Sequence, residues 1–371
     1  MLNHWIGDRF KQITLSNQVQ RRMTLIDGLR GIAALMVVFP HSAGLWDKTT
    51  TSSYFSAFMR AVGSYGVLGV EIFFVLSGFT IAYSVRKAQI APNWLLNFLL
   101  KRFVRLTLPY WISIGVISLV LLLRFYLGNA KSNILPSPNQ FFAHLFYAQG
   151  LFGYKHLNVI YWTLCIEVQF YIVFGLLITG LSFISERWFH GRASAVTYPF
   201  LFITLISFSR PFQSAEVAHT KIFTPYWFIF ASGVLIWWAI DRKISRQIGW
   251  LVVACLWGFA AITAEIGIAA AALTTTLIYL AGISEKLYVW LNFHPLQFLG
   301  LISYSLYIIH VPIISCTFGI RTRLSDGSDF ANLLLFIMVI TLCISSSAMF
   351  YQLIEVPSIN WARKIGLNRQ K

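Results

Sequence analysis

Long apolar stretches separated by short polar segments dominate this chain of 371 residues. Most of these stretches contain few charges and are long enough to cross the hydrocarbon core of a bilayer as helices. The pattern predicts an all-α integral membrane protein with about ten transmembrane helices. The predicted spans are residues 29–46, 66–85, 106–127, 160–183, 195–209, 222–241, 248–264, 266–283, 296–320 and 331–355.

The composition supports this fold class. Hydrophobic residues make up 57% of the chain, charged residues only 11%, and the mean hydropathy is +0.67. A soluble domain would carry about 25% charged residues, so a soluble protein is excluded. We predict a cytoplasmic lead over residues 1–24, one transmembrane domain over 25–357 and a cytoplasmic tail over 358–371.

The net charge of +16 has an uneven distribution that indicates topology. With Arg30 counted among the amino-terminal flank, 20 of the Lys and Arg residues fall on one side of the predicted membrane and 8 on the other. Cytoplasmic loops carry such an excess of basic residues, so both termini are predicted to be cytoplasmic. The charge therefore reports membrane orientation, and no nucleic-acid partner is expected.

Two further features bear on organisation. Residues 128–159 form the longest interruption between spans, and the apolar stretch within it is too short to cross a bilayer. We expect this segment to lie in the interface or to re-enter from the outer side. The four cysteines fall inside predicted spans without paired spacing, which predicts neither a disulfide nor a metal site.

The first span carries two polar residues that lipid does not tolerate well. Arg30 and His41 are eleven residues apart, so on a helix they share one face and are separated by roughly 16 Å along the axis. A charge at the centre of a span costs about 2.5–3.5 kcal/mol, so such groups usually face a cavity. Asp27 is placed to pair with Arg30, and Pro40 is expected to kink the helix. The alternatives are a rim ion pair that sets helix depth and a hydrogen-bonded core histidine.

Arg102 and Arg105 form a second basic feature, between the second and third spans. Their spacing places both guanidinium groups on one helix face at the cytoplasmic surface, where two such forks can hold phosphate oxygens. A phosphorylated donor from the cytosol would need this arrangement. The alternative is a positive anchor that contacts lipid headgroups.

Acidic residues stand in two other spans. Glu167 follows Trp162 inside the fourth span, where a carboxylate is expected to find a partner or take up a proton. An imidazole on another span is the partner we predict, and a protonated Glu167 bonded to backbone is the alternative. Glu71 lies near the outer end of the second span, and Ser77 follows in the same helix, where it could simply allow close helix packing.

The ninth and tenth spans add a polar stripe and a helix end. Ser303, Tyr307 and His310 fall on one face of the ninth span, although packing alone could explain them. Glu355 stands just before Pro357, and we interpret this ending as a helix stop with little chemistry.

Together these motifs resemble acyltransferase family 3, the bacterial inner-membrane acyltransferases that decorate surface polysaccharides. The resemblance rests on Arg-x10-His, residues 69–78, Arg-x2-Arg, the Trp-Thr-Leu-x2-Glu-x-Gln-Phe-Tyr segment and Ile-Ser-Tyr-Ser-Leu-Tyr-x2-His, in that order over residues 24–357. It implies a ten-helix core in the bacterial inner membrane, acetyl-CoA or another acyl-CoA as donor, and a polysaccharide or lipid-linked glycan as acceptor. Val168 departs from the family, which often has a second acid there, and Cys165 replaces a frequent serine.

The resemblance implies roles for the candidate residues. Arg30 and His41 would be the essential pair, and Arg102, Arg105 and Arg30 would hold the donor. We expect His41 to accept the proton of the sugar hydroxyl and Glu167 to orient its imidazole. An acyl-histidine intermediate is the alternative route. Substrate-side candidates are Glu71, Ser77, Trp162, Tyr307 and His310.

Two rival functions, a transporter and a scaffold, are weighed against the sequence features. Intramembrane charges and a broken first helix are also compatible with a transporter or flippase for a glycolipid or small anion. A flippase predicts matching halves, yet residues 186–371 contain no copy of the motifs in the first half. A membrane scaffold would leave Arg30, His41 and Glu167 unexplained.

Overall fold

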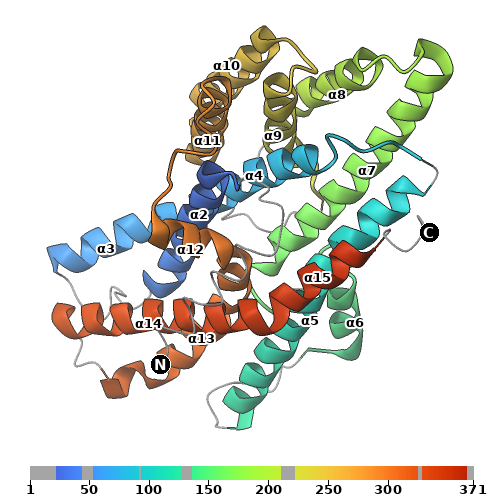
Figure 1. Ribbon diagram of the computed structural model, residues 1–371. Coiled ribbons are helices and arrows are strands. Elements are labelled where there is room, and N and C mark those ends of the chain that lie inside the picture. Colours follow the sequence, from blue (N-terminus) through green and yellow to red (C-terminus); the bar gives the residue numbers. More distant parts are fainter. Residues whose placement is uncertain are drawn as a thin grey trace.

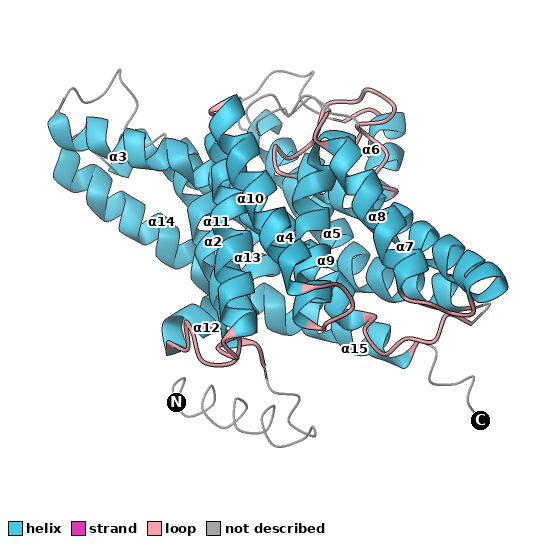
Figure 2. Ribbon diagram, turned by 90° about the horizontal axis from the view of Figure 1, so that it is seen from above, coloured by secondary structure: helices cyan, strands magenta, loops and turns pink. Residues whose placement is uncertain are grey.

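The computed structural model describes residues 22–43, 53–91, 93–126, 136–209, 222–324 and 328–365. Within these ranges the regular elements are helices, as predicted, without any strand (Figure 2). Most of the predicted lead and the last residues of the predicted tail lie outside them. The helices are α2 (Thr24–Ala43), α3 (Tyr54–Ser64), η2 (Tyr65–Leu68), α4 (Gly69–Ser84), α5 (Trp94–Tyr126), α6 (Pro138–Leu145), α7 (Tyr161–Phe189), α8 (Ser194–Ser207), η5 (Thr224–Tyr226), α9 (Trp227–Ile240), α10 (Arg246–Thr263), α11 (Ile266–Ile283), α12 (His294–Leu301), α13 (Ser303–Leu324), α14 (Asp329–Phe350), η6 (Tyr351–Glu355) and α15 (Val356–Lys364).

Seven helical stretches in the described part are long and apolar enough to cross a membrane, and a bent pair would make an eighth. The predicted spans 195–209 and 222–241 correspond to shorter apolar helices, α8 and η5–α9. The protein is therefore a multi-span membrane protein. The seven stretches are Thr24–Ser42, Tyr54–Ser84, Trp94–Tyr126, Tyr161–Phe189, Arg246–Thr263, Ile266–Ile283 and Asp329–Lys364.

The predicted ninth span is not one continuous helix. It breaks at Ile302 into α12 and α13, which meet at an angle of 74°. The break lets α12 pack closely against the start of α2: a Cβ at Gly300 would come within 2.0 Å of the Asp27 carbonyl oxygen. Gln297 donates a hydrogen bond of 2.8 Å to the Thr24 carbonyl oxygen at the same contact. The sequence pattern missed this bend because both halves are apolar.

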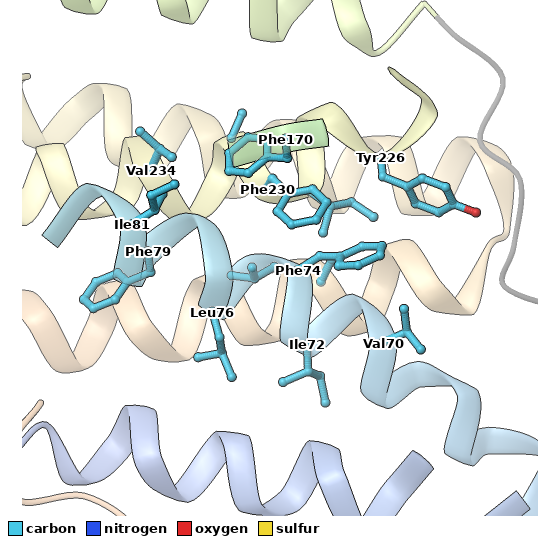
Figure 3. Close-up of a cluster of buried hydrophobic side chains, with 14 of the residues drawn as sticks. Val70, Ile72, Phe74, Leu76, Phe79, Ile81, Phe170, Tyr226, Phe230 and Val234 are labelled. Carbon is cyan, nitrogen blue, oxygen red and sulfur yellow. The ribbon is translucent and has the colours of Figure 1, made fainter. Parts of the chain in front are cut away.

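The centre of the bundle is the contact between α4 and α9. Gly78 and Gly233 bring the two backbones together, since a Cβ at either position would come within 1.8 or 2.1 Å of a carbonyl oxygen on the other helix. Small residues allow such close packing between helices in a membrane. Beside them the Phe230 ring stacks on Phe74 at 4.3 Å and on Phe170 at 4.4 Å between centroids (Figure 3). This aromatic layer ties α7 to the α4–α9 pair.

The segment before α7 folds back onto the bundle. Tyr147 stacks on Tyr110 of α5 with centroids 4.3 Å apart. His144 is buried; its Nδ1 lies 2.8 Å from the Gln140 carbonyl oxygen, and its Nε2 accepts a 3.0 Å bond from the Leu157 N–H. These bonds satisfy both ring nitrogens, so His144 holds this segment in place.

The carboxyl-terminal helices complete the arrangement. Figure 1 shows α13 beside α14, and α15 running alongside α5. Ser358 of α15 donates hydrogen bonds to the carbonyl oxygens of Val104 and Arg105, at 2.6 and 3.0 Å. This packing brings α15 against the helix that carries Arg102 and Arg105.

Candidate active site

Five helices, α2, α4, α5, α7 and α13, enclose a cavity of about 220 Å³. Its polar lining contains six of the residues singled out in the sequence. These six are Arg30, Ser77, Arg102, Arg105, Glu167 and Tyr307. The apolar lining consists of Val70, Phe73, Phe74, Leu76, Leu106 and Leu164. Charged groups from separate spans are thus gathered around one internal space.

Three arginines face this cavity. Arg30 comes from α2, and Arg102 and Arg105 come from adjacent turns of α5. Arg102 donates a hydrogen bond of 2.8 Å to the Ser84 hydroxyl, and its guanidinium lies 5.3 Å from the centre of the Tyr171 ring. These contacts fix Arg102 in place, and three positive charges make the cavity a suitable site for an anion.

Asp27 does not pair with Arg30, contrary to our expectation. Its carboxylate forms an ion pair with Arg22, with Nε and Oδ2 3.1 Å apart. Arg30 donates instead to the Ser303 hydroxyl of α13 at 3.2 Å. The Arg30 guanidinium is therefore directed to the α13 side of its helix, where it lines the cavity.

Glu167 also differs from its predicted role. Its Oε1 accepts hydrogen bonds from the Ser77 hydroxyl at 2.6 Å and from the Tyr171 hydroxyl. These two hydroxyls are 2.7 Å from each other. The expected bond between Glu167 and the imidazole of His41 is therefore wrong: the acid pairs with α4 and with its own helix, because Tyr171 lies one turn further along α7.

Glu355 is a buried acid to which the sequence pattern gave no chemical role. It ends the π-helical turn η6 and is 3% exposed, and its Oε2 accepts a 2.5 Å hydrogen bond from the Ser305 hydroxyl. Glu355 is therefore held by α13, the helix that also carries Ser303, the partner of Arg30. An acid within an apolar span was the available signal, but its position before Pro357 resembled a helix end.

His41 and His310 form a separate pair next to the cavity. Their ring centroids are 5.2 Å apart and the rings are inclined by 43°. His310 Nδ1 lies 3.0 Å from the Leu306 carbonyl oxygen, and its Nε2 is buried without a hydrogen-bond partner among the described residues. An unsatisfied buried polar atom costs about 1–3 kcal/mol, so this nitrogen needs an explanation.

The predicted shared face of Arg30 and His41 is confirmed. Arg30 contacts Ser303 near the start of α13, and His41 contacts His310 further along the same helix. The two helices therefore run parallel along this seam. α2 continues through Pro40 rather than ending there, and the proline packs against Gly66, where a Cβ would lie 2.3 Å from its Cδ.

Tyr307 separates the cavity from the histidine pair. It lines the cavity, and its hydroxyl lies 2.5 Å from the Thr163 hydroxyl of α7. The Tyr307 ring centroid is 6.2 Å from that of His310. The stripe predicted on this helix therefore extends from the Arg30 partner, Ser303, past Tyr307 to the histidine pair.

Besides the histidine pair, two further candidates do not line the cavity. Trp162 is packed in the aromatic core, with its ring 5.7 Å from Tyr226 and 6.3 Å from Phe74. Glu71 is buried against α11, where a Cβ at Gly267 would come within 2.9 Å of its Oε1. The structure therefore gives these two side chains packing positions rather than cavity-facing ones.

Comparisons with known proteins provide independent information on the chain. A family model described as acyltransferase domain matches residues 24–351. The peptidoglycan O-acetyltransferase OatA of Listeria monocytogenes is 24% identical over 332 residues, which cover 79% of this chain and 49% of the relative. The O-acetyltransferase OatA of Staphylococcus aureus is 24% identical over 347 residues, 78% of this chain and 50% of the relative.

A third similarity is shorter. Protein 2 in the picA locus of Rhizobium radiobacter is 30% identical over 128 residues, 33% of this chain and 56% of that protein. The chain spans about half the length of the curated relatives it matches. No solved structure matches it significantly.

Proposed function

The chain belongs to the acyltransferase domain family, and on this premise we propose that it transfers an acyl group from cytosolic acyl-CoA to a glycan hydroxyl. The acyl group proposed is acetyl, and the acceptor is an exported polysaccharide or lipid-linked glycan. The observation that carries the proposal is a cavity lined by three arginines with a histidine pair directly behind its Tyr307 wall. The names of two relatives, O-acetyltransferases of which one is assigned to peptidoglycan, support this choice.

The arginines are suited to hold the donor. CoA carries several phosphate groups, and guanidinium groups bind phosphate oxygens through paired N–H donors. Arg102 and Arg105 would take these phosphates, together with Arg30 in the same cavity. The thioester would then lie toward Tyr307, among the apolar lining.

His41 is the proposed general base. It takes the proton from the acceptor hydroxyl while the hydroxyl oxygen forms a bond to the thioester carbonyl carbon. The carbon–sulfur bond then breaks, and the proton passes from His41 to the CoA sulfur. A positioned base contributes about 10²–10⁴-fold in rate. Tyr307 lines the cavity and its ring lies next to His310, so the thioester would approach His41 past this side chain.

In the proposed topology, ten spans cross a bacterial inner membrane and both termini lie on its cytoplasmic side. The uneven distribution of basic residues supports this orientation. So does the parallel course of α2 and α13, because the first and ninth spans of such a protein enter from the same side. The arginine cavity would then be reached from the cytosol.

The experiment is a transfer assay with the purified protein in nanodiscs. Acetyl-labelled acetyl-CoA and an extract of lipid-linked and polymeric glycans are supplied, and free CoA thiol and alkali-labile labelled ester are measured together. An acyltransferase produces both in equal amounts. A flippase would move glycolipid and release no CoA, and that result would end the proposal. His41→Ala is the matched negative control.

A further inference from the structure

We infer that His310 is a positioning residue for His41. In this inference, which rests on the proposed function, His310 Nε2 accepts a hydrogen bond from one ring N–H of His41. That bond fixes the tautomer of His41 and leaves its other ring nitrogen bare, ready to take the proton of the acceptor hydroxyl. The inference starts from the buried nitrogen of His310 that has no partner among the described residues.

The hydrogen bonding of His310 defines its tautomer. Its Nδ1 is 3.0 Å from the Leu306 carbonyl oxygen, one turn earlier in α13. A carbonyl oxygen can only accept, so Nδ1 carries the hydrogen of this bond. In a neutral imidazole the other nitrogen is then an acceptor. His310 Nε2 is therefore a fixed lone pair in a fully buried place.

His41 is the donor best placed to meet this lone pair. Two imidazoles joined by an in-line hydrogen bond of about 2.9 Å have ring centres roughly 5 Å apart. The observed separation of the His41 and His310 centroids is 5.2 Å, which matches such a bond when one ring N–H of His41 is turned toward His310 Nε2. The Tyr307 hydroxyl, at the next nearest ring, is already engaged by Thr163 at 2.5 Å.

A neutral partner suits this location in the membrane. In a hydrolase triad a carboxylate holds the histidine and stabilises the imidazolium. Here the carboxylate of Glu167 is bonded elsewhere, and an ionised group among these apolar spans would be costly. A histidine that accepts a hydrogen bond can orient His41 without bringing a second charge. His310 keeps its own proton throughout, and the proton taken by His41 leaves on the CoA sulfur.

Three substitutions separate positioning from packing. Asn at position 310 reaches the place of Nδ1, so His310→Asn keeps the bond to Leu306 and loses the acceptor at the Nε2 position. Gln reaches the place of Nε2, so His310→Gln keeps an acceptor oxygen for His41. His310→Phe fills the space and retains neither. Each variant is assayed for CoA release and glycan ester in nanodiscs, together with its thermal unfolding.

We expect His310→Asn and His310→Phe to lower kcat about tenfold or more, with KM for acetyl-CoA within about twofold of wild type. His310→Gln should recover most of the lost kcat. Wild-type kcat in His310→Asn would overturn the inference, and so would equal losses in all three variants. If the wild type itself transfers no acyl group while remaining folded, the proposed function fails, and this inference fails with it.

Discussion

The two ends of the seam between α2 and α13 differ in chemistry. At the Arg30 end the helices stand around a cavity lined by charged and hydroxyl side chains. At the His41 end two imidazoles pack directly against each other, and Tyr307 stands between the two regions. One end is suited to hold a large anion, and the other is suited to move a proton.

In the proposed function, this difference corresponds to donor binding at the arginine end and proton transfer at the histidine end. If so, substitutions at the arginine end should change KM for the donor, and substitutions at the histidine end should change kcat.

The largest effect is expected at the histidine end. His41→Ala should lower kcat by about 10²–10⁴-fold, because it removes the proposed base, while KM for acetyl-CoA stays close to wild type. Steady-state CoA release by the purified variant measures both constants. A folded variant with near wild-type turnover would remove His41 from the chemistry.

At the arginine end the expected change is in binding. Arg102→Ala and Arg105→Ala should each raise KM for acetyl-CoA by about 10- to 100-fold, since a hydrogen bond to a charged group contributes about 1.5–3 kcal/mol. Arg86→Ala is the matched control: this guanidinium lies 3.8 Å from the Tyr83 ring centre and bonds the Tyr83 carbonyl oxygen. An equal rise in KM for Arg86→Ala would show that general surface charge, rather than the cavity, determines donor binding.

Glu167 provides a smaller test of the same division. Glu167 lines the same cavity as Arg102, so Glu167→Gln, which removes an acid from the site of the anionic donor, should tighten donor binding and lower KM for acetyl-CoA by roughly threefold. The amide oxygen can still accept from Ser77 and Tyr171, so kcat should remain within tenfold of wild type. A collapse of kcat to the level of His41→Ala would instead give the Glu167 carboxylate a direct chemical role.

The smallest change in rate is expected in the helix contact beneath the cavity. Gly78→Ala should reduce the free energy of unfolding by about 3 kcal/mol, because its Cβ would meet the Phe230 carbonyl oxygen at 1.8 Å. Turnover per folded molecule should change little, since the cavity side chains remain. Gly115→Ala is the control, with no atom within 4 Å of its Cβ, and should be neutral or slightly stabilising. Thermal unfolding in detergent compares the two, and equal stabilities would contradict the close α4–α9 packing.

Hydropathy predicted the helices well, because burying a backbone in lipid requires its hydrogen bonds to be formed within the helix. Each predicted span corresponds to helical structure in the described residues, and the break after Thr263 lies where the sequence indicated it. Hydropathy could not predict the angle between α12 and α13 at Ile302, since this angle depends on α12 packing against α2 around Gly300.

Some features of the candidate site could likewise be predicted from the sequence, and others could not. Helical periodicity correctly placed Arg30 and His41 on one face, because that relation is local to one helix. The partners of Asp27 and Glu167 were predicted wrongly, because each had several polar groups within reach and packing selected among them. Glu355 was interpreted as part of a helix stop because its bond to Ser305 depends on α13 and η6 meeting, which the linear sequence does not show.

By itself the sequence determined that this protein is a helical membrane protein of the acyltransferase domain family with ionisable groups inside its spans, since apolar length and motif order are properties of the linear chain. Only the tertiary structure decided that three arginines share one cavity and that His310 is the neighbour of His41. It also decided that Glu167 accepts hydrogen bonds from Ser77 and Tyr171. The physical reason is that hydrogen bonds and electrostatic interactions between spans depend on which helix faces meet. Which helix faces meet is determined by the packing of small and aromatic residues along several helices at once.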